Sequence, residues 1–324
     1  IGVIFAGSVG MGAQRWFQLG PFSFQPSEFA KIIMIIALAT FFSERQRMET
    51  GFDTTALLIM TGIPFLLIFK QPDLGTALVF LVILIGMLAY SWASPKLLIL
   101  IVTPLISIVL RPMLFVWLAY LLAMIVALFL TRASTWDWIL ILGINVLVGL
   151  AVPFIWHLLK PYQQLRILTF LDPSSDPYGA GYHSLQSQIA IGSGGLFGKG
   201  FLHGSQTQLQ FIPEQHSDFI FSAIGEELGL LGSILVLGSF FVIVCRAFII
   251  ASEADNIFGG LLAAGIGSMI GFHVFANVGM TVGLLPVVGI PLPLVSFGGT
   301  ALVMNLMAIG ILQSIYMRRK KILF

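Results

Sequence analysis

The sequence predicts an all-α fold, a polytopic membrane helical bundle. Hydrophobic residues make up 58% of the chain and charged residues 9%, with a mean hydropathy of +1.00, whereas a soluble domain is about half apolar and about a quarter charged. The apolar residues form continuous runs without two-residue alternation. Because lipid leaves every backbone polar group to be paired internally, such runs favour helices over a barrel. We expect one membrane domain over residues 1–324.

Nine apolar stretches approach the about 20 residues that a spanning helix needs. They are residues 32–42, 57–69, 77–92, 97–110, 113–130, 138–159, 219–251, 258–282 and 301–317. We expect residues 1–10 to be the end of a further apolar segment and not a signal peptide, because no charged leader precedes them.

Positive residues at the ends of the spans indicate the orientation. The C-terminal cluster and the short loop with Arg45 and Arg47 predict a cytoplasmic C-terminus; the cluster is Arg318, Arg319, Lys320 and Lys321. The net charge of +2 does not indicate a nucleic-acid partner, and the single Cys245 excludes an internal disulfide framework.

Two segments between spans face outward in this topology. The longer one, residues 160–217, contains several prolines and a helix-compatible stretch at 183–191, so we expect an ordered platform at the membrane surface. The second, residues 283–300, is apolar and rich in Pro and Gly. It cannot be helical throughout, and we expect it to be buried against protein as a re-entrant or surface segment.

Ionisable groups gather where the first outward segment meets the next span. The stretch FIPEQHSDFIFSAIGEELG (211–229) holds four of the 14 acidic residues and one of the five histidines, namely Glu214, Asp218, Glu226, Glu227 and His216. Asp218 has two interpretations: a helix N-cap, or a carboxylate whose partial desolvation suits it to be a general base. We expect Glu226 to be a buried structural acid and His216 to shape the site.

A second charged group begins the first predicted span. Glu28 and Lys31, at i and i+3 of a helix that starts at Pro26, share one face. They form either a self-neutralising ion pair or a pair in which Lys31 faces a substrate anion.

Other polar residues have predicted structural roles. Asp73 is expected to cap the helix that follows it. His273 and Asn277, at i and i+4, either hydrogen-bond between helices or line the cavity, and we favour the bond between helices.

Several separated blocks resemble one known family, the SEDS proteins, and within it the RodA-like branch. They are GAQRWF (12–17), QPSEFAK (25–31), QPDLGTA (71–77), YQQLR (162–166), residues 171–232 with GKGFLHGSQTQLQFIPEQHSDF, and GLLPVVGIPLPLVSFGGTALV (283–303). Two departures stand out. The family usually has three helices before the first block, and the stretch between residues 92 and 162 is longer than expected by about one helical hairpin.

The resemblance implies a peptidoglycan glycosyltransferase that polymerises lipid II on the outer face of the bacterial cytoplasmic membrane, for cell-wall elongation. Asp218 matches the family's catalytic aspartate. Substrate-binding roles at the lipid II pyrophosphate or sugar are expected for Lys31, Glu28, Arg15, Trp16, Lys199 and His216. The sequence leaves open whether a divalent cation, Mg²⁺ or Mn²⁺, bridges Asp218 and the pyrophosphate.

The chain has no S-x-x-K motif, so we expect crosslinking to come from a partner. The resemblance implies that this partner is a class B penicillin-binding protein, within the elongation machinery. Three alternatives stay open: a flippase or transporter for a lipid-linked precursor, an FtsW-like division polymerase, and a noncatalytic scaffold.

Overall fold

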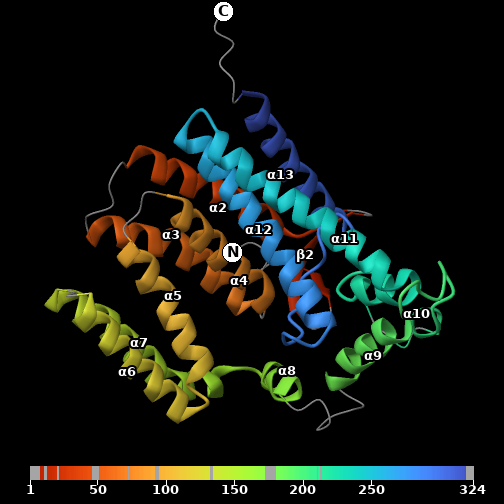
Figure 1. Ribbon diagram of the computed structural model, residues 1–324, viewed down its shortest axis with the longest axis horizontal. Helices are drawn as coiled ribbons and strands as arrows, with labels where there is room; N and C mark the ends of the chain where they lie inside the picture. The colour runs from red at the N-terminus through yellow and green to blue at the C-terminus, as the bar shows by residue number, and fades with distance from the viewer. Residues whose placement is uncertain are drawn as a thin grey trace, which may run out of the picture.

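The computed structural model describes residues 8–10, 13–19, 22–45, 51–71, 73–91, 95–131, 134–171, 180–209, 211 and 214–318. Its helices are α2 (Pro26–Glu44), α3 (Gly51–Lys70), α4 (Leu74–Tyr90), α5 (Pro95–Leu110), α6 (Leu114–Leu130), α7 (Thr135–Leu158), α8 (Pro161–Leu171), α9 (Ala180–Ser193), α10 (Ser205–Gln208), α11 (Ile220–Glu253), α12 (Ile257–Thr281) and α13 (Gly299–Arg318). Figure 1 shows them as one helical bundle, which confirms the predicted all-α membrane fold.

Among the described residues, five helices are long and apolar enough to cross a bilayer: α2, α7, α11, α12 and α13. Four shorter apolar helices, α3 to α6, account for the other predicted stretches within the described ranges. Each predicted apolar stretch therefore coincides with a helix. That all of them cross the membrane stays a prediction.

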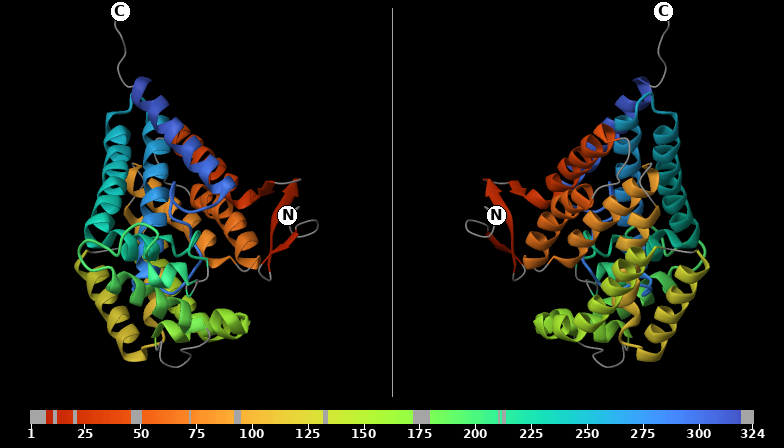
Figure 2. Two further views of the ribbon diagram at one scale, coloured as in Figure 1. Left: turned by 90° about the vertical axis from the view of Figure 1, so that its right-hand side faces the viewer. Right: turned by 90° about the vertical axis from the view of Figure 1, so that its left-hand side faces the viewer.

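A small antiparallel sheet precedes the helices. β1 (Ser8–Gly10) pairs with β2 (Ala13–Leu19), which pairs with β3 (Phe22–Phe24). Figure 2 shows this sheet at one side of the bundle. The expectation that residues 1–10 end a spanning segment is wrong for Ser8–Gly10, where glycine disfavours a helix and the neighbouring strand offers pairing. Residues 1–7 lie outside the described residues.

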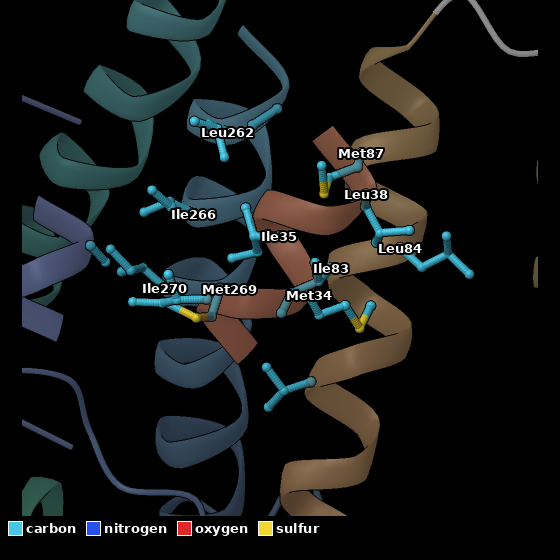
Figure 3. Packing of buried hydrophobic residues seen from close by; sticks show 14 of the residues in the cluster. Met34, Ile35, Leu38, Ile83, Leu84, Met87, Leu262, Ile266, Met269 and Ile270 are labelled. Carbon is cyan, nitrogen blue, oxygen red and sulfur yellow. The ribbon is translucent and has the colours of Figure 1, made fainter. Parts of the chain in front are cut away.

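Helix α12 is the centre of the bundle. In its most apolar window 67% of the residues are buried, compared with 17% for α7. Figure 3 shows Ile266 and Met269 of α12 packed with Ile35 of α2 and Met87 of α4. Gly265 allows this contact, because a Cβ there would lie 2.9 Å from side-chain atoms of both Ile35 and Met87. Small residues bring membrane helices close in this way.

Helices α5, α6 and α7 form a separate group at the opposite side of the bundle from α9 and α10 (Figure 1). Its interior holds a polar network beside a small apolar cluster: Ser107 donates to Asn145 Oδ1 at 2.9 Å, and Asn145 Nδ2 donates to Thr103 Oγ1 at 2.9 Å. The indole of Trp117 donates to Ser107 at 3.2 Å. Such interhelical hydrogen bonds hold helices together in lipid, where there is no hydrophobic force between them.

Residues 160–217 include helices α8, α9 and α10, and α9 covers the 183–191 stretch that was predicted to be helical. Ser187 of α9 lies 2.6 Å from Ser222 Oγ of α11 and donates to the Thr281 carbonyl of α12 at 2.6 Å. All three residues are buried. These bonds fix α9 across the ends of α11 and α12, so this part of the platform is ordered.

Candidate active site

Asp218 lies half-buried in a turn, residues 214–219, that leads into α11. Helix α11 begins at Ile220, and its N-cap is Phe219, with no side-chain capping bond. The N-cap interpretation of Asp218 is therefore wrong, because the helix starts one residue later than the capping position would require. The carboxylate belongs to the Asp218 turn and not to the first turn of the helix.

Three consecutive carbonyl groups of the Asp218 turn each accept one hydrogen bond. Phe297 N donates to His216 O at 2.8 Å, and Ser296 Oγ donates to Ser217 O at 2.6 Å. Asn277 Nδ2 donates to Asp218 O at 2.8 Å. With these three carbonyls engaged, the backbone of the turn is held in one position, and the direction of the Asp218 side chain is constrained.

The donors come from α12 and from the segment at residues 283–298, which is non-helical and buried in its middle, as predicted. Ile290 and Leu292 are each 1% exposed. Asn277 also donates to Ile290 O at 2.8 Å, and so joins this segment to the Asp218 turn. Gly289 has a φ of +70°, and a Cβ there would lie 3.2 Å from Asp218 Oδ2. The segment therefore approaches the Asp218 carboxylate itself.

Lys31 of α2 is buried between two partners. Its ammonium lies 2.8 Å from Glu28 Oε1 and 3.1 Å from His273 Nε2. His273 Nδ1 lies 2.9 Å from Met269 O, a carbonyl that can only accept. Nδ1 therefore carries the proton, and Nε2 accepts from Lys31. Glu28 and Lys31 therefore form the predicted ion pair. The neutral imidazole of His273 is a second partner of Lys31, which the sequence did not predict.

Helix α12 brings the two groups together. His273 contacts Lys31, and Asn277 contacts the Asp218 turn. Residues four apart on a helix share one face and are about 6 Å apart along the axis. The prediction of a bond between helices is confirmed for His273, which contacts Lys31 of α2, and is wrong for Asn277, which bonds to the Asp218 turn and to Ile290 O. The contacts of α12 with the charged pair and with the Asp218 turn are thus about one helical turn apart along α12.

Lys199 belongs to another cluster. Its ammonium lies 2.8 Å from Glu226 Oε1 and 2.7 Å from Ser205 Oγ. Glu226, which is 0% exposed, also accepts from the backbone N–H groups of Gln206 and Thr207 at 2.9 and 3.0 Å. The predicted structural role of Glu226 is confirmed. Glu226 lies about 9 Å along α11 from its first residue, Ile220, so the structure binds Lys199 to a part of α11 beyond the Asp218 turn.

The remaining predicted site residues are more scattered. Trp16 lies in β2 and is half-buried, whereas the side chain of Arg15 lies outside the described residues. His216 is exposed, with its Nε2 3.4 Å from Gln215 Nε2. Asp73 caps α4 as predicted, accepting from Thr76 N at 3.1 Å. Among the residues with described side chains, no group of three His, Cys, Asp or Glu has a metal-binding arrangement.

Sequence reasoning missed Ser296 and Gly289, because their roles depend on a contact between segments about 70 to 80 residues apart. The available signal was compositional: a Pro- and Gly-rich apolar stretch that cannot be helical has to be supported by specific bonds.

The family described as cell cycle proteins, which comprises FtsW, RodA and SpoVE, matches residues 1–121 and 92–321. The overlap lies in the stretch expected to be one hairpin too long. The chain is 42% identical to the peptidoglycan glycosyltransferase MrdB of Escherichia coli K12, over 97% of this chain and 74% of MrdB. It is 36% identical to the peptidoglycan glycosyltransferase RodA of Treponema pallidum, over 95% of this chain and 78% of that protein.

A solved structure of a peptidoglycan synthase complex, described as coordinating polymerisation and crosslinking, contains a similar chain. It superposes with a TM-score of 0.69 at 29% identity, over 98% of this chain and 77% of the other.

Proposed function

This chain belongs to the cell cycle protein family of FtsW, RodA and SpoVE, and from that membership we propose that it is a peptidoglycan glycosyltransferase for cell-wall elongation. It polymerises lipid II into glycan strands and releases the lipid pyrophosphate. The relatives named MrdB and RodA support this activity. The active site faces outward, residues 160–217 and 283–300 lie outside, and the C-terminus is cytoplasmic.

The reaction joins two lipid-linked disaccharides. A hydroxyl of one sugar attacks the anomeric carbon of the other, a glycosidic bond forms, and the bond to the pyrophosphate breaks. The Asp218 carboxylate accepts the proton of the attacking hydroxyl. This role requires a carboxylate at a fixed position beside the substrate. The hydrogen bonds to three carbonyls of the Asp218 turn support it, because they hold the backbone that carries the carboxylate.

Lys31 supplies positive charge for the departing pyrophosphate. Glu28 and His273 hold the ammonium, and His273 is one helical turn from Asn277, which bonds to the Asp218 turn. Because Lys31 is 3% exposed, the pyrophosphate has to displace one of these partners. Arg15, Trp16 and His216 bind the sugar or pyrophosphate, and Lys199 acts from its Glu226 cluster. A divalent cation, if required, binds at Asp218.

The observation that carries the proposal is the shared face of α12, where His273 and Asn277 connect a buried lysine to a half-buried aspartate. Proteoliposomes with this chain, lipid II and a class B penicillin-binding protein should produce glycan strands. Movement of lipid II across the bilayer without any polymer would overturn the proposal in favour of a transporter, and neither activity would favour a scaffold.

The partner is a class B penicillin-binding protein that supplies the transpeptidase. Support comes from the similar chain in a synthase complex that couples polymerisation with crosslinking. The contact surface includes α12, α13 and the 283–298 segment, on which Leu284 is 73% and Phe297 84% exposed. Phe297→Ala should weaken co-purification with the transpeptidase, whereas Phe154→Ala, at an exposed phenylalanine of α7, should not. Equal co-purification of both variants would refute this surface.

A further inference from the structure

A glycine-rich loop, residues 194–202, carries four exposed large apolar side chains: Leu196 at 61%, Phe197 at 79%, Phe201 at 72% and Leu202 at 61%. The loop lies within the segment expected to face water. Contiguous exposed apolar side chains on a water-facing loop are unfavourable, and they mark an interaction surface.

The loop is built into a break in α11. Gly229 has φ +66° and ψ −162°, a conformation open essentially to glycine alone, and it interrupts the helix. Leu230 N donates to Gly195 O at 2.9 Å and Leu231 N to Leu196 O at 3.2 Å. The backbone groups after the break are therefore paired with the loop.

The carbonyls before the break are paired as well. Lys199 N donates to Glu226 O and Gly200 N to Glu227 O, each at 3.0 Å. A Cβ on Gly229 would collide with Gly198 N, and one on Gly198 with Glu227 O. Backbone that leaves helical form at membrane depth is tolerated when protein satisfies it, and these bonds meet that condition. The loop is thereby fixed to α11 at a defined height.

The length of α11 indicates where the break lies relative to the hydrocarbon core. Residues 230–253 at about 1.5 Å each extend about 36 Å, which is enough to cross the about 30 Å hydrocarbon core without help from the turns before Gly229. Together with the predicted topology, this length leads us to expect the break at the outer boundary of the core, where aromatic side chains are favoured.

The surface of α11 beyond the break is apolar and exposed, as lipid contact requires: Leu230, Leu231, Ile234 and Leu235 are between 51% and 70% exposed. The backbone bonds from Leu230 and Leu231 place Leu196 beside this surface. The charge of Lys199 is paired with Glu226, so the loop brings no unpaired cation to the boundary. Figure 1 shows the chain that follows α9 beside the first part of α11.

We propose that the glycine-rich loop is an interfacial membrane anchor, with Leu196, Phe197, Phe201 and Leu202 covered by lipid acyl chains of the outer leaflet. By fixing the height of the first turns of α11, the anchor also fixes the height of the Asp218 turn relative to the bilayer surface. The anchoring itself does not depend on the proposed glycosyltransferase activity.

Spin-label accessibility tests the anchor directly. In a Cys245→Ser background, single cysteines at Phe197 and Phe201 carry a nitroxide in phosphatidylethanolamine and phosphatidylglycerol vesicles. Leu235→Cys provides the lipid reference on the same helix. Asp255→Cys, in the exposed turn after α11, provides the water reference. Each label is probed with oxygen, which concentrates in lipid, and with a water-soluble nickel chelate.

We expect the labels at Phe197 and Phe201 to have oxygen-to-nickel accessibility ratios close to that at Leu235 and well above that at Asp255. Ratios like that at Asp255 at both positions would overturn the proposal. Protection from both probes only after addition of a class B penicillin-binding protein would also overturn it, because the loop would then be a protein contact. Because the accessibility ratio is measured separately at Phe197 and at Phe201, a label that disturbs the loop at one position does not decide the result.

Discussion

Asn277 Nδ2 lies 2.8 Å from the carbonyl oxygen of Asp218, so a buried amide of the central helix bonds directly to the backbone of the proposed base. The same amide group bonds to Ile290 O at 2.8 Å. One side chain thus sets the catalytic turn against both the bundle core and the 283–298 segment, and a shift of either is transmitted to Asp218.

Ser296→Ala should lower kcat for glycan synthesis by about tenfold, which corresponds to about 1.4 kcal/mol of transition-state stabilisation, with little change in KM. The variant removes the donor to Ser217 O and loosens the turn, while lipid II contacts persist. Ser239→Ala is the matched control, because Ser239 bonds only within its own helix in the described contacts. A Ser296→Ala enzyme with normal kcat and a lower Tm would reduce Ser296 to a structural role.

Replacing Glu28 or Lys31 alone by leucine should destabilise the fold by about 3–5 kcal/mol, because the remaining charge stays buried without its partner. Replacing both should restore much of the thermal stability. We expect the double variant to fold and to make no polymer, since the cation for the pyrophosphate is missing. Restored glycan synthesis in the double variant would remove Lys31 from the site.

Gly229→Ala should lower the Tm in detergent. Its backbone conformation costs a non-glycine residue about 1–3 kcal/mol, and the added Cβ would collide with Gly198 N. Gly238→Ala on the same helix has open space around the added methyl group, and alanine is the better helix former by about 1 kcal/mol, so its Tm should hold or rise. Equal effects at the two positions would contradict the rigid break.

The stability of the fold should depend on pH through His183 of α9. Burial, with a smaller contribution from the charge of Arg166, lowers the pKa of the imidazole below its usual 6.5. The unfolded chain then binds the proton more readily, so this group's stabilisation is present above pH 6.5 and is lost as the pH falls toward the folded pKa. His183→Phe should therefore flatten the decline of Tm on acidification. An unchanged slope would show that His183 is not the group responsible.

Much of the fold follows from the sequence because lipid makes a long apolar run sufficient for a helix. That His273 and Asn277 share one face of a helix also followed from their spacing, whereas the non-helical partners of Asn277 did not. The break at Gly229 did not, since IGEELGLLG reads as continuous helix and glycine is common in membrane helices. Its stabilising partners, Gly195 and Lys199, lie about 30 residues earlier in the chain. The strands at residues 8–24 were missed because their pairing, and not their composition, determines them.

The most direct test of the proposed function is the polymerisation rate of Asp218→Asn in proteoliposomes with lipid II and the class B transpeptidase. Glu253→Gln, an exposed acid at the other end of α11, is the control. We predict that Asp218→Asn retains its Tm and partner binding but loses about a hundredfold to ten-thousandfold in rate, while Glu253→Gln polymerises normally. A well-folded Asp218→Asn protein that makes glycan at a rate near that of the unmodified chain would contradict the assignment of Asp218 as the base.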